Sequence, residues 1–377
     1  MINLFEPSPS NKTINLIKNI FKKKYFYKDT YCEIFLEKFS KFQNLKKKNI
    51  VLGASCSDLI FNIMYTSRNI IKKKLVLVPS NSFPAVASAV IRAGLNLKII
   101  DIDHTTGNIS FDELKKIKKS RIGCIFLTHY GGSPVNIMKI KKIIDKKTLI
   151  FEDCAGALGS FYNDNSSIGS RGDFACWSFD PMKMITCGEG GAAYIKDKKL
   201  FNSFSENLYL GLKTSEKQGI NSALSKDKWW RYQLKSYGSR SVFTEINASI
   251  GLPQLDKINE ILKKRQQIRK LYLKLLSNQK NLRFLENSGG KKYSNYFLTI
   301  FAKKRDNLAK FLYKNKIYSS LRYYPLNKIK IFKKFCKNSN YEGSNYFEKH
   351  ALNLPMHQGL KISDVKKISD KINSFYK

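Results

Sequence analysis

Short apolar runs alternate with amphipathic stretches along the chain from about residue 49. The runs occupy residues 49–52, 75–78, 97–100, 124–127 and 149–151, and the stretches 58–71 and 85–93 between them have the spacing of helices. Short β-branched runs separated by helices are typical of βαβ units, which build a mostly parallel sheet with helices on both faces. In such sheets, ligands bind beyond the carboxyl ends of the strands.

The pattern changes after residue 173. Two further apolar runs, residues 174–179 and 192–195, flank a glycine-rich turn at residues 188–191. A long helical pattern with mixed charge on one face follows at residues 244–273. Beyond it we expect a strand at residues 296–301, a helix at 306–315 and a closing helix at 362–375, the content of a small α+β domain.

The chain of 377 residues is too long for one ordinary compact core. We therefore expect an α/β protein with two domains: a large domain with an N-terminal arm over residues 1–250, and a small C-terminal domain over residues 251–377. A composition of 42% hydrophobic and 26% charged residues fits a folded globular protein and excludes a disordered one.

The formal net charge of +39 would ordinarily point to nucleic acid or an anionic membrane surface. The basic residues, however, are mostly lysines in short scattered runs, such as residues 22–24 and 115–119, with no basic-aromatic recognition module. We expect a solvated basic surface and no dedicated nucleic-acid function. Such a surface would still steer an anionic substrate toward the protein.

Seven cysteines form no CxxC pair and no metal-ligand spacing, so we expect no metal site. An odd number of unpatterned cysteines fits a reducing cytoplasm. The N-terminal residues lack the basic-then-apolar order of a signal peptide, and no apolar stretch is long enough to span a bilayer. The sequence thus predicts a cytoplasmic protein without a membrane segment.

A carboxylate and a lysine stand out for their chemistry. Asp153 directly follows the buried strand at residues 149–151, and Lys183 follows Ser178 and precedes the glycine-rich turn. Pyridoxal 5'-phosphate (PLP) needs this set: a lysine to form an imine, a carboxylate to keep the ring nitrogen protonated, and hydroxyl and backbone N–H groups for the phosphate. Each feature alone is common in α/β proteins.

The surrounding sequence resembles the DegT/DnrJ/EryC1/StrS family of PLP-dependent sugar aminotransferases. The similar segments follow in the same order along most of the chain: residues 53–58, 79–83, 101–109, 129–132, 152–159, 169–173, 178–183, 188–191, 244–255 and 354–357. The resemblance implies the PLP-dependent transferase (aspartate aminotransferase, type I) fold. It also implies a homodimer with active sites at the subunit interface.

The resemblance assigns roles to individual residues. Lys183 would carry the cofactor and move the proton during transfer, and Asp153 would pair with the ring nitrogen. Ser178, Ser57 and the backbone of Cys56 would bind the phosphate.

Other aromatic and histidine positions are less specific. Phe83 matches the aromatic residue that stacks on the cofactor ring, with ordinary core packing as the alternative. His129 and His357 are better explained as structural residues than as catalytic ones. Tyr323 and Tyr324 fall where the family has a substrate-side loop.

Three positions depart from the family pattern. Gly156 stands where a Gln or His usually reaches the phenolic oxygen of the cofactor, so this hydrogen bond must come from elsewhere or be missing. Arg240, expected to bind cofactor phosphate, replaces an Asn that crosses to the partner subunit, and Val242 replaces a basic residue. An Arg in this place can bind a phosphate or a substrate diphosphate.

The resemblance implies transfer of an amino group, with glutamate as the expected donor, to a nucleotide-linked keto sugar for a surface polysaccharide or related glycan. Two alternatives stay open. One is a PLP-dependent sugar dehydratase, in which His typically replaces the lysine, so that Lys183 argues against it. The other is a non-catalytic or regulatory protein that keeps the fold, which Gly156, Arg240 and the net charge would accommodate.

Overall fold

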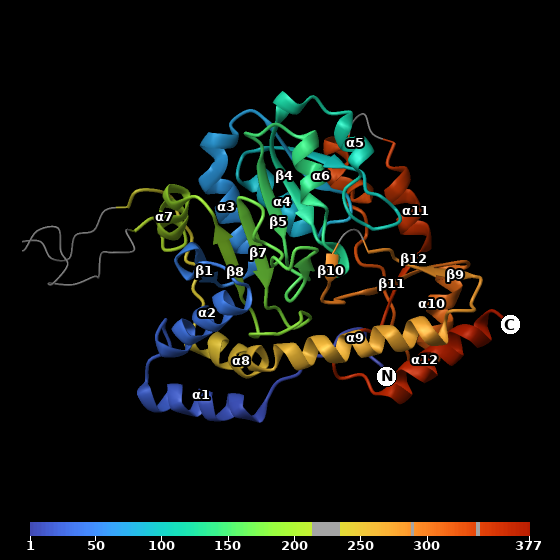
Figure 1. Ribbon diagram of the computed structural model, residues 1–377. Coiled ribbons are helices and arrows are strands. Elements are labelled where there is room, and N and C mark those ends of the chain that lie inside the picture. The colour runs from blue at the N-terminus through green and yellow to red at the C-terminus, as the bar shows by residue number, and fades with distance from the viewer. Residues whose placement is uncertain (213–233, 288–289, 337–339) are drawn as a thin grey trace, which may run out of the picture.

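The computed structural model describes residues 1–212, 234–287, 290–336 and 340–377 (Figure 1). These residues form a seven-stranded sheet in the order β1-β8-β7-β5-β4-β2-β3. The five neighbours from β7 to β3 run parallel, and β8 is antiparallel to both β1 and β7. The predicted α/β architecture is therefore confirmed. The strands are β1 (Ile50–Gly53), β2 (Leu75–Pro79), β3 (Asn96–Ile100), β4 (Ile122–Thr128), β5 (Leu149–Asp153), β7 (Phe174–Ser178) and β8 (Gly191–Ile195).

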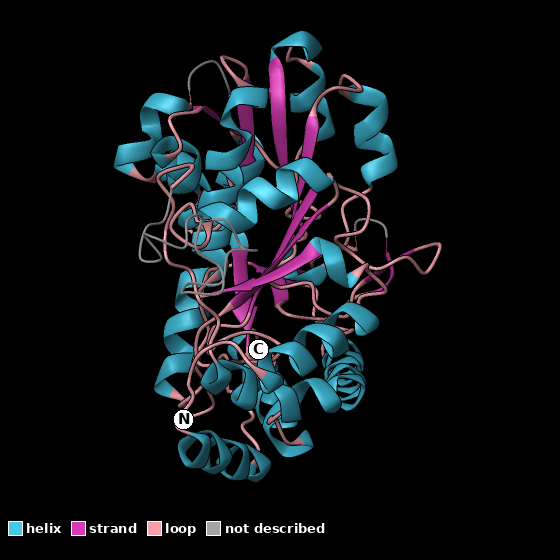
Figure 2. Cartoon of the chain, turned by 90° about the vertical axis from the view of Figure 1, so that its left-hand side faces the viewer, coloured by secondary structure: helices cyan, strands magenta, loops and turns pink. Residues whose placement is uncertain are grey.

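Helices cover both faces of this sheet (Figure 2). Successive side chains of a strand point to opposite faces, so Leu77 of β2 joins one apolar cluster, while Val76 and Val78 join the other. Burial on both faces explains why the strands are continuously apolar. The first cluster includes α2 (Thr30–Phe42), α6 (Ile137–Ile143) and α8 (Glu245–Asp256), and the second includes α3 (Cys56–Ile71), α4 (Pro84–Arg92) and α7 (Lys198–Asn207).

The helical pattern predicted at residues 244–273 corresponds to two helices, α8 and α9 (Ile258–Leu275), separated at Lys257. Thr244 starts α8 with a capping box, in which its side chain and that of Asn247 satisfy each other's backbone N–H groups. Lys257 leaves helical geometry and separates the two helices. From this break, α9 extends from the sheet toward the C-terminal elements (Figure 1).

The C-terminal elements surround a third apolar cluster, to which α9 contributes Ile268 and Tyr272. A three-stranded antiparallel sheet has the order β12-β11-β9, and β11 (Leu298–Ala302) confirms the strand predicted at residues 296–301. The predicted helices at 306–315 and 362–375 are α10 (Arg305–Lys314) and α12 (Ile362–Phe375). The remaining helices and strands are α1 (Asn11–Lys23), α5 (Phe111–Lys115), α11 (Glu342–His350), β6 (Phe161–Tyr162), β9 (Leu282–Phe284), β10 (Gly290–Lys292) and β12 (Ala351–Leu354).

The first residues of the chain lie against these C-terminal elements. Ile2 pairs with Ile317 in a parallel bridge, and the carbonyl of Leu4 accepts a hydrogen bond of 3.3 Å from the amide of Met356. Phe5 then stacks on Tyr296, with ring centroids 5.5 Å apart. The N-terminal segment is thus held by residues that lie 291 to 352 positions away in sequence.

None of the helices formed by the described residues has the length and apolar character needed to cross a membrane.

Candidate active site

A cavity of about 400 Å³ opens at the carboxyl ends of β4, β5 and β7. Its volume lies within the range of roughly 300–1,000 Å³ that is usual for small-molecule sites. Of the predicted site residues, six line it: Cys56, Ser57, Phe83, Asp153, Ser178 and Lys183. The structure therefore brings these six together at the edge of the sheet where the strand pattern predicts a ligand.

Lys183 lies in the loop that connects β7 to β8. This loop is closed at its base by the amide of Phe179, which donates to the carbonyl of Gly190 at 2.9 Å. The side chain of Gln254, on α8, fixes the loop through both the N–H and the C=O of Thr186. The Lys183 side chain is only 11% exposed, and its ammonium group faces the cavity on a firmly held loop.

The charge of Lys183 is set by its neighbours. Burial acts to lower the pKa of this lysine, but Tyr296, Tyr323 and Asp180 outweigh burial and raise the pKa above its ordinary value. The carboxylate of Asp180 lies 3.6 Å from Nζ. Because tyrosines are neutral phenols near neutral pH, Asp180 is the neighbour among these three that holds the lysine protonated there.

Asp153 is the last residue of β5, in the middle of the sheet edge. Its Oδ1 atom accepts a hydrogen bond of 3.1 Å from the amide of Ala155. Burial raises the pKa of this carboxyl group, while the Ala155 amide and the charge of Lys183 act in the opposite direction. A buried carboxylate in a cavity wall favours a cationic partner, because the partner's charge offsets the cost of burial.

The third feature is a corner rich in backbone N–H groups. Ser178 ends β7 and pairs directly with Gly191 at the start of β8. A Cβ atom on Gly191 would lie 2.7 Å from the backbone nitrogen of Cys56, so only glycine lets the first turn of α3 approach this closely. Ser55 caps the helix by accepting from the amide of Asp58, and Ser57 is exposed to the cavity. This corner offers hydroxyl groups and a helix N-terminus to an anion.

Aromatic side chains enclose the rest of the cavity. Phe83 precedes α4 and is 49% exposed, which argues against the alternative of core packing. Its ring centroid lies 5.6 Å from that of the half-buried Tyr323. Tyr324 is 52% exposed and does not line the cavity.

Two residues from the C-terminal half complete the wall, and the sequence did not single them out. Tyr296 is 3% exposed, and its ring centroid lies 5.1 Å from Nζ of Lys183. Arg322 also lines the cavity, and no carboxylate of the described residues forms an ion pair with it. One guanidinium nitrogen of Arg322 donates to the sulfur of Met182 at 3.4 Å, and its Nε has no partner within the described part of the chain. A lone arginine before Tyr323-Tyr324-Pro325 gives no local sequence signal of a site, so only the tertiary arrangement reveals it.

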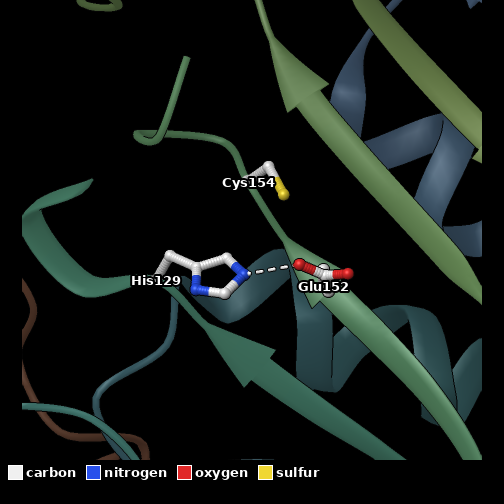
Figure 3. Close-up of side chains that lie close together, drawn as sticks. All are labelled: His129, Glu152 and Cys154. Carbon is white, nitrogen blue, oxygen red and sulfur yellow. Dashed lines mark hydrogen bonds and ion pairs between the residues drawn. The ribbon is translucent and has the colours of Figure 1, made fainter. Parts of the chain in front are cut away.

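His129, Glu152 and Cys154 form a buried cluster, of which His129 lines the cavity (Figure 3). Their possible ligand atoms lie within 4.8 Å of one another, which is close enough for a metal ion. However, Glu152 already accepts hydrogen bonds from the side chains of His129 and Tyr162 and from the amides of residues 169, 171 and 172. The cluster is therefore a hydrogen-bonded support rather than a metal site.

His129 and His357, the two histidines predicted to be structural, both make hydrogen bonds to other protein groups. Nδ1 of His129 accepts from the amide of Val135 at 3.0 Å, so Nε2 carries the proton and donates to Glu152. Nε2 of His357 lies 3.2 Å from the carbonyl of Asn3 and helps to hold the N-terminal segment.

A model of the DegT/DnrJ/EryC1/StrS aminotransferase family matches residues 7–373. The chain belongs to this family.

Individual relatives agree with this assignment. The chain is 28% identical to dTDP-4-dehydro-2,3,6-trideoxy-D-glucose 4-aminotransferase of Saccharopolyspora spinosa, over 98% of this chain and 96% of the relative. It is also 28% identical to UDP-4-amino-4,6-dideoxy-N-acetyl-beta-L-altrosamine transaminase of Campylobacter jejuni, over 87% and 85% of the two chains. GDP-perosamine synthase of Vibrio cholerae is 25% identical, over 92% and 91%.

Solved structures share the fold. An aminotransferase from Streptoalloteichus hindustanus superposes with a TM-score of 0.88 at 25% identity, covering 99% of this chain and 98% of that one. The Helicobacter pylori aminotransferase of pseudaminic acid biosynthesis superposes with a TM-score of 0.89 at 21% identity, with 99% and 98% covered. The PLP-dependent transferase fold implied by the sequence is thus confirmed.

Membership of an aminotransferase family identifies PLP as the cofactor, because this cofactor carries the amino group in such enzymes. The residues present fit it. The anion-binding corner suits its phosphate, the buried Asp153 suits a protonated ring nitrogen, and Lys183 faces the same cavity. Asp153 ends β5, Ser178 of the anion-binding corner ends the neighbouring β7, and Lys183 lies in the loop after β7, so one ligand can touch all three.

Arg240 is not among the residues that line the cavity. It is exposed, and its guanidinium lies 5.6 Å from the ring centroid of Tyr209. In a single chain this residue therefore cannot hold the cofactor of its own site, and the expected role depends on a second subunit. Val242, two residues later, is half-buried.

Proposed function

We propose that this protein transfers an amino group from an amino acid to a nucleotide-linked keto sugar. The observation that carries the proposal is the convergence of Lys183, Asp153 and the first turn of α3 on one cavity in a member of an aminotransferase family. PLP supplies the electron sink that makes this chemistry possible.

The residues of the chain divide the remaining tasks. Asp153 keeps a proton on the ring nitrogen, while Ser57, Ser178 and the backbone at Cys56 hold the phosphate. Phe83 covers one face of the ring. The side chain of Lys183 would hold the cofactor and, once displaced, would move the proton between the substrate carbon that carries the amino group and the cofactor carbon to which the lysine had been joined.

The substrates follow from the relatives and from the charge of the protein. The three relatives above are named for sugars bound to dTDP, UDP or GDP. A net charge of +39 would steer a nucleotide diphosphate toward the cavity. The guanidinium of Arg322 has the geometry to bind the carboxylate of an amino donor such as glutamate.

The expected assembly and location complete the proposal. A homodimer would let the exposed Arg240 reach the cofactor phosphate of the partner subunit. The large domain, residues 1–250, would hold the cofactor, and the small domain, residues 251–377, would bring Tyr296 and Arg322 to it. All seven cysteines are free thiols, which favours the cytoplasm.

The test is spectroscopic. The purified protein, mixed with PLP, should develop the visible absorption band of a lysine-bound cofactor. Lys183→Ala should lack the band, whereas Lys314→Ala, at an exposed position far along the chain, should keep it. A wild-type protein without the band would refute the proposed cofactor site.

The amino donor provides the second stage of the test. Added L-glutamate should convert the band to the spectrum of pyridoxamine phosphate, and a keto-sugar nucleotide should restore it. A stable band that glutamate leaves unchanged would instead favour the non-catalytic binding protein. Loss of a sugar hydroxyl without formation of an amino sugar would favour the dehydratase.

A further inference from the structure

A hydrogen-bond donor to the phenolic oxygen of PLP must lie on the side of the cavity that this oxygen faces. That side follows from where the ring nitrogen and the phosphate are held. On the pyridine ring, the phenolic oxygen and the phosphate arm flank the ring carbon that bears the aldehyde, and the ring nitrogen lies opposite that ring carbon. The aldehyde is the group that a lysine attacks. With the nitrogen at Asp153, the position of the phosphate therefore decides where the phenolic oxygen points.

The strand order fixes this direction. Ser178 ends β7, and the first turn of α3 lies against Gly191 of β8, so the phosphate corner is on the β7–β8 side of Asp153. The strand on the other side of β5 is β4. The phenolic oxygen must then face the residues that follow β4 and β5.

Tyr296 occupies that side. Its amide donates to the carbonyl of Gly131, just beyond β4, at 3.0 Å. A Cβ atom on Gly156, just beyond β5, would lie 2.4 Å from Cδ1 of the Tyr296 ring. The absence of a side chain at position 156 is thus what gives the tyrosine ring its space.

The ring is held in place, but its hydroxyl group is available. Phe5 stacks on one face of Tyr296, and the side chain of Ser294 donates to the carbonyl of Gly156 at 2.8 Å, which fixes the neighbouring backbone. Within the described residues the Tyr296 hydroxyl has no hydrogen-bond partner, and its oxygen is not fully buried. Because the tyrosine side chain lines the cavity, the hydroxyl faces it. Nζ of Lys183 lies over the Tyr296 ring, 5.1 Å from its centroid, so the tyrosine is close to the group that would hold the cofactor.

We propose that the Tyr296 hydroxyl donates a hydrogen bond to the phenolic oxygen of PLP, replacing the side chain that Gly156 lacks. The inference rests on the proposed cofactor site around Lys183 and Asp153. It assigns to a residue of the C-terminal half a contact that sequence comparison expects three residues after Asp153. Gly156 and Tyr296 then form one functional unit.

The experiment is a pH titration of the visible absorption band of the PLP-loaded protein. A donor to the phenolic oxygen stabilises its negative charge and weakens its hold on the proton of the adjacent imine nitrogen. Tyr296→Phe keeps the ring but removes the donor, so the pH midpoint should rise by roughly one pH unit. Tyr313→Phe, an exposed tyrosine on α10, should titrate like the wild type.

A swap variant guards against a purely structural effect. Tyr296→Ala alone should show the raised midpoint, and the double variant Gly156→Gln/Tyr296→Ala should return it toward the wild-type value, because the glutamine amide can donate in the vacated space. An unchanged midpoint in Tyr296→Phe, or no recovery in the double variant, overturns the inference. A wild-type protein without the band refutes the proposed cofactor site instead, so the two failures are distinguishable.

Discussion

Nζ of Lys183 lies 3.6 Å from Oδ2 of Asp180, which precedes it by three residues in the same loop. The side chain of Asp180 is 33% exposed and also receives a long hydrogen bond of 3.4 Å from the Ser178 hydroxyl. One carboxylate thus contacts both the lysine and a proposed phosphate ligand. An anion in this position keeps the lysine protonated and opposes the phosphate.

Replacement of this carboxylate should speed cofactor attachment. Asp180→Asn removes the negative charge that raises the pKa of Lys183, so more of the lysine is the free amine at neutral pH. We expect the rate of band formation with PLP to increase by about tenfold or less near pH 7, with its pH midpoint shifted downward. Stopped-flow absorbance across a pH series measures this, with the exposed Asp370→Asn as control. An unchanged rate profile would show that Asp180 does not set the charge of Lys183.

The buried carboxylate of Glu152 should be essential for stability. Glu152→Leu leaves His129, Tyr162 and three backbone amides without an acceptor, and the free energy of unfolding should fall by about 3–5 kcal/mol. Glu152→Gln keeps acceptor capacity and should lose less. Urea denaturation measures both, with the exposed Glu260→Gln as control. A loss below about 1 kcal/mol in the Leu variant would contradict this role.

The ionisation of Glu152 should also make the stability of the protein depend on pH. Burial raises the pKa of Glu152, but hydrogen bonds from His129, Tyr162 and the amide of residue 169 outweigh burial and hold the pKa below its usual value. The stability that ionised Glu152 contributes is complete above the ordinary glutamate pKa of about 4.3. It is lost as the pH falls through the lower pKa of this residue in the folded protein. Wild-type stability should therefore decline in this acidic window, and the Glu152→Gln variant should show a weaker decline. Parallel pH profiles would contradict the assignment.

Gly191→Ala should damage the phosphate corner. The added Cβ would lie 2.7 Å and 2.9 Å from backbone atoms of Cys56, neither of which is the end of a flexible side chain. Displacement of the first turn of α3 should weaken PLP binding at least about tenfold and cost about 1–3 kcal/mol of stability. Gly94→Ala is the control, since its Cβ would meet open space, although its positive φ makes it mildly destabilising. Fluorescence titration with PLP should find normal affinity in the control. Equal affinities in the two variants would sink the prediction.

Arg322→Gln should separate the two half-reactions. If the guanidinium binds the donor carboxylate, the KM for glutamate should rise by about tenfold or more, while the half-reaction with the keto-sugar nucleotide stays near normal. Arg322→Lys keeps the charge but loses the bidentate geometry, so an intermediate effect is expected. Single-turnover absorbance with each substrate measures both half-reactions. A defect confined to the sugar half would assign Arg322 to the diphosphate instead.

The sequence predicts the cofactor half of the site because its residues sit at the ends of strands. Asp153 and Ser178 terminate β5 and β7, whose continuous apolar pattern marks them as buried parallel strands. Since such strand ends meet at one edge of the sheet, their proximity follows from the pattern. The family resemblance then selects Lys183, Ser57 and Phe83 from many similar residues.

The other half of the site depends on tertiary arrangement that no local pattern encodes. Tyr296 and Arg322 line the cavity although they follow Lys183 by more than a hundred residues and come from the elements beyond α9. The break at Lys257, which sets the start of α9, has neither glycine nor proline at that position, so the sequence pattern runs through it. Arg240, in turn, can be placed in a site only with a second subunit.

The attachment of the N-terminal segment also determines when the cavity can be completed during synthesis. Residues 2–5 leave the ribosome more than three hundred positions before their partners Ile317 and Met356. Phe5 can therefore pack against Tyr296 only after these C-terminal partners have emerged. Until then, the nascent sheet carries its lysine and carboxylate without the wall that encloses them.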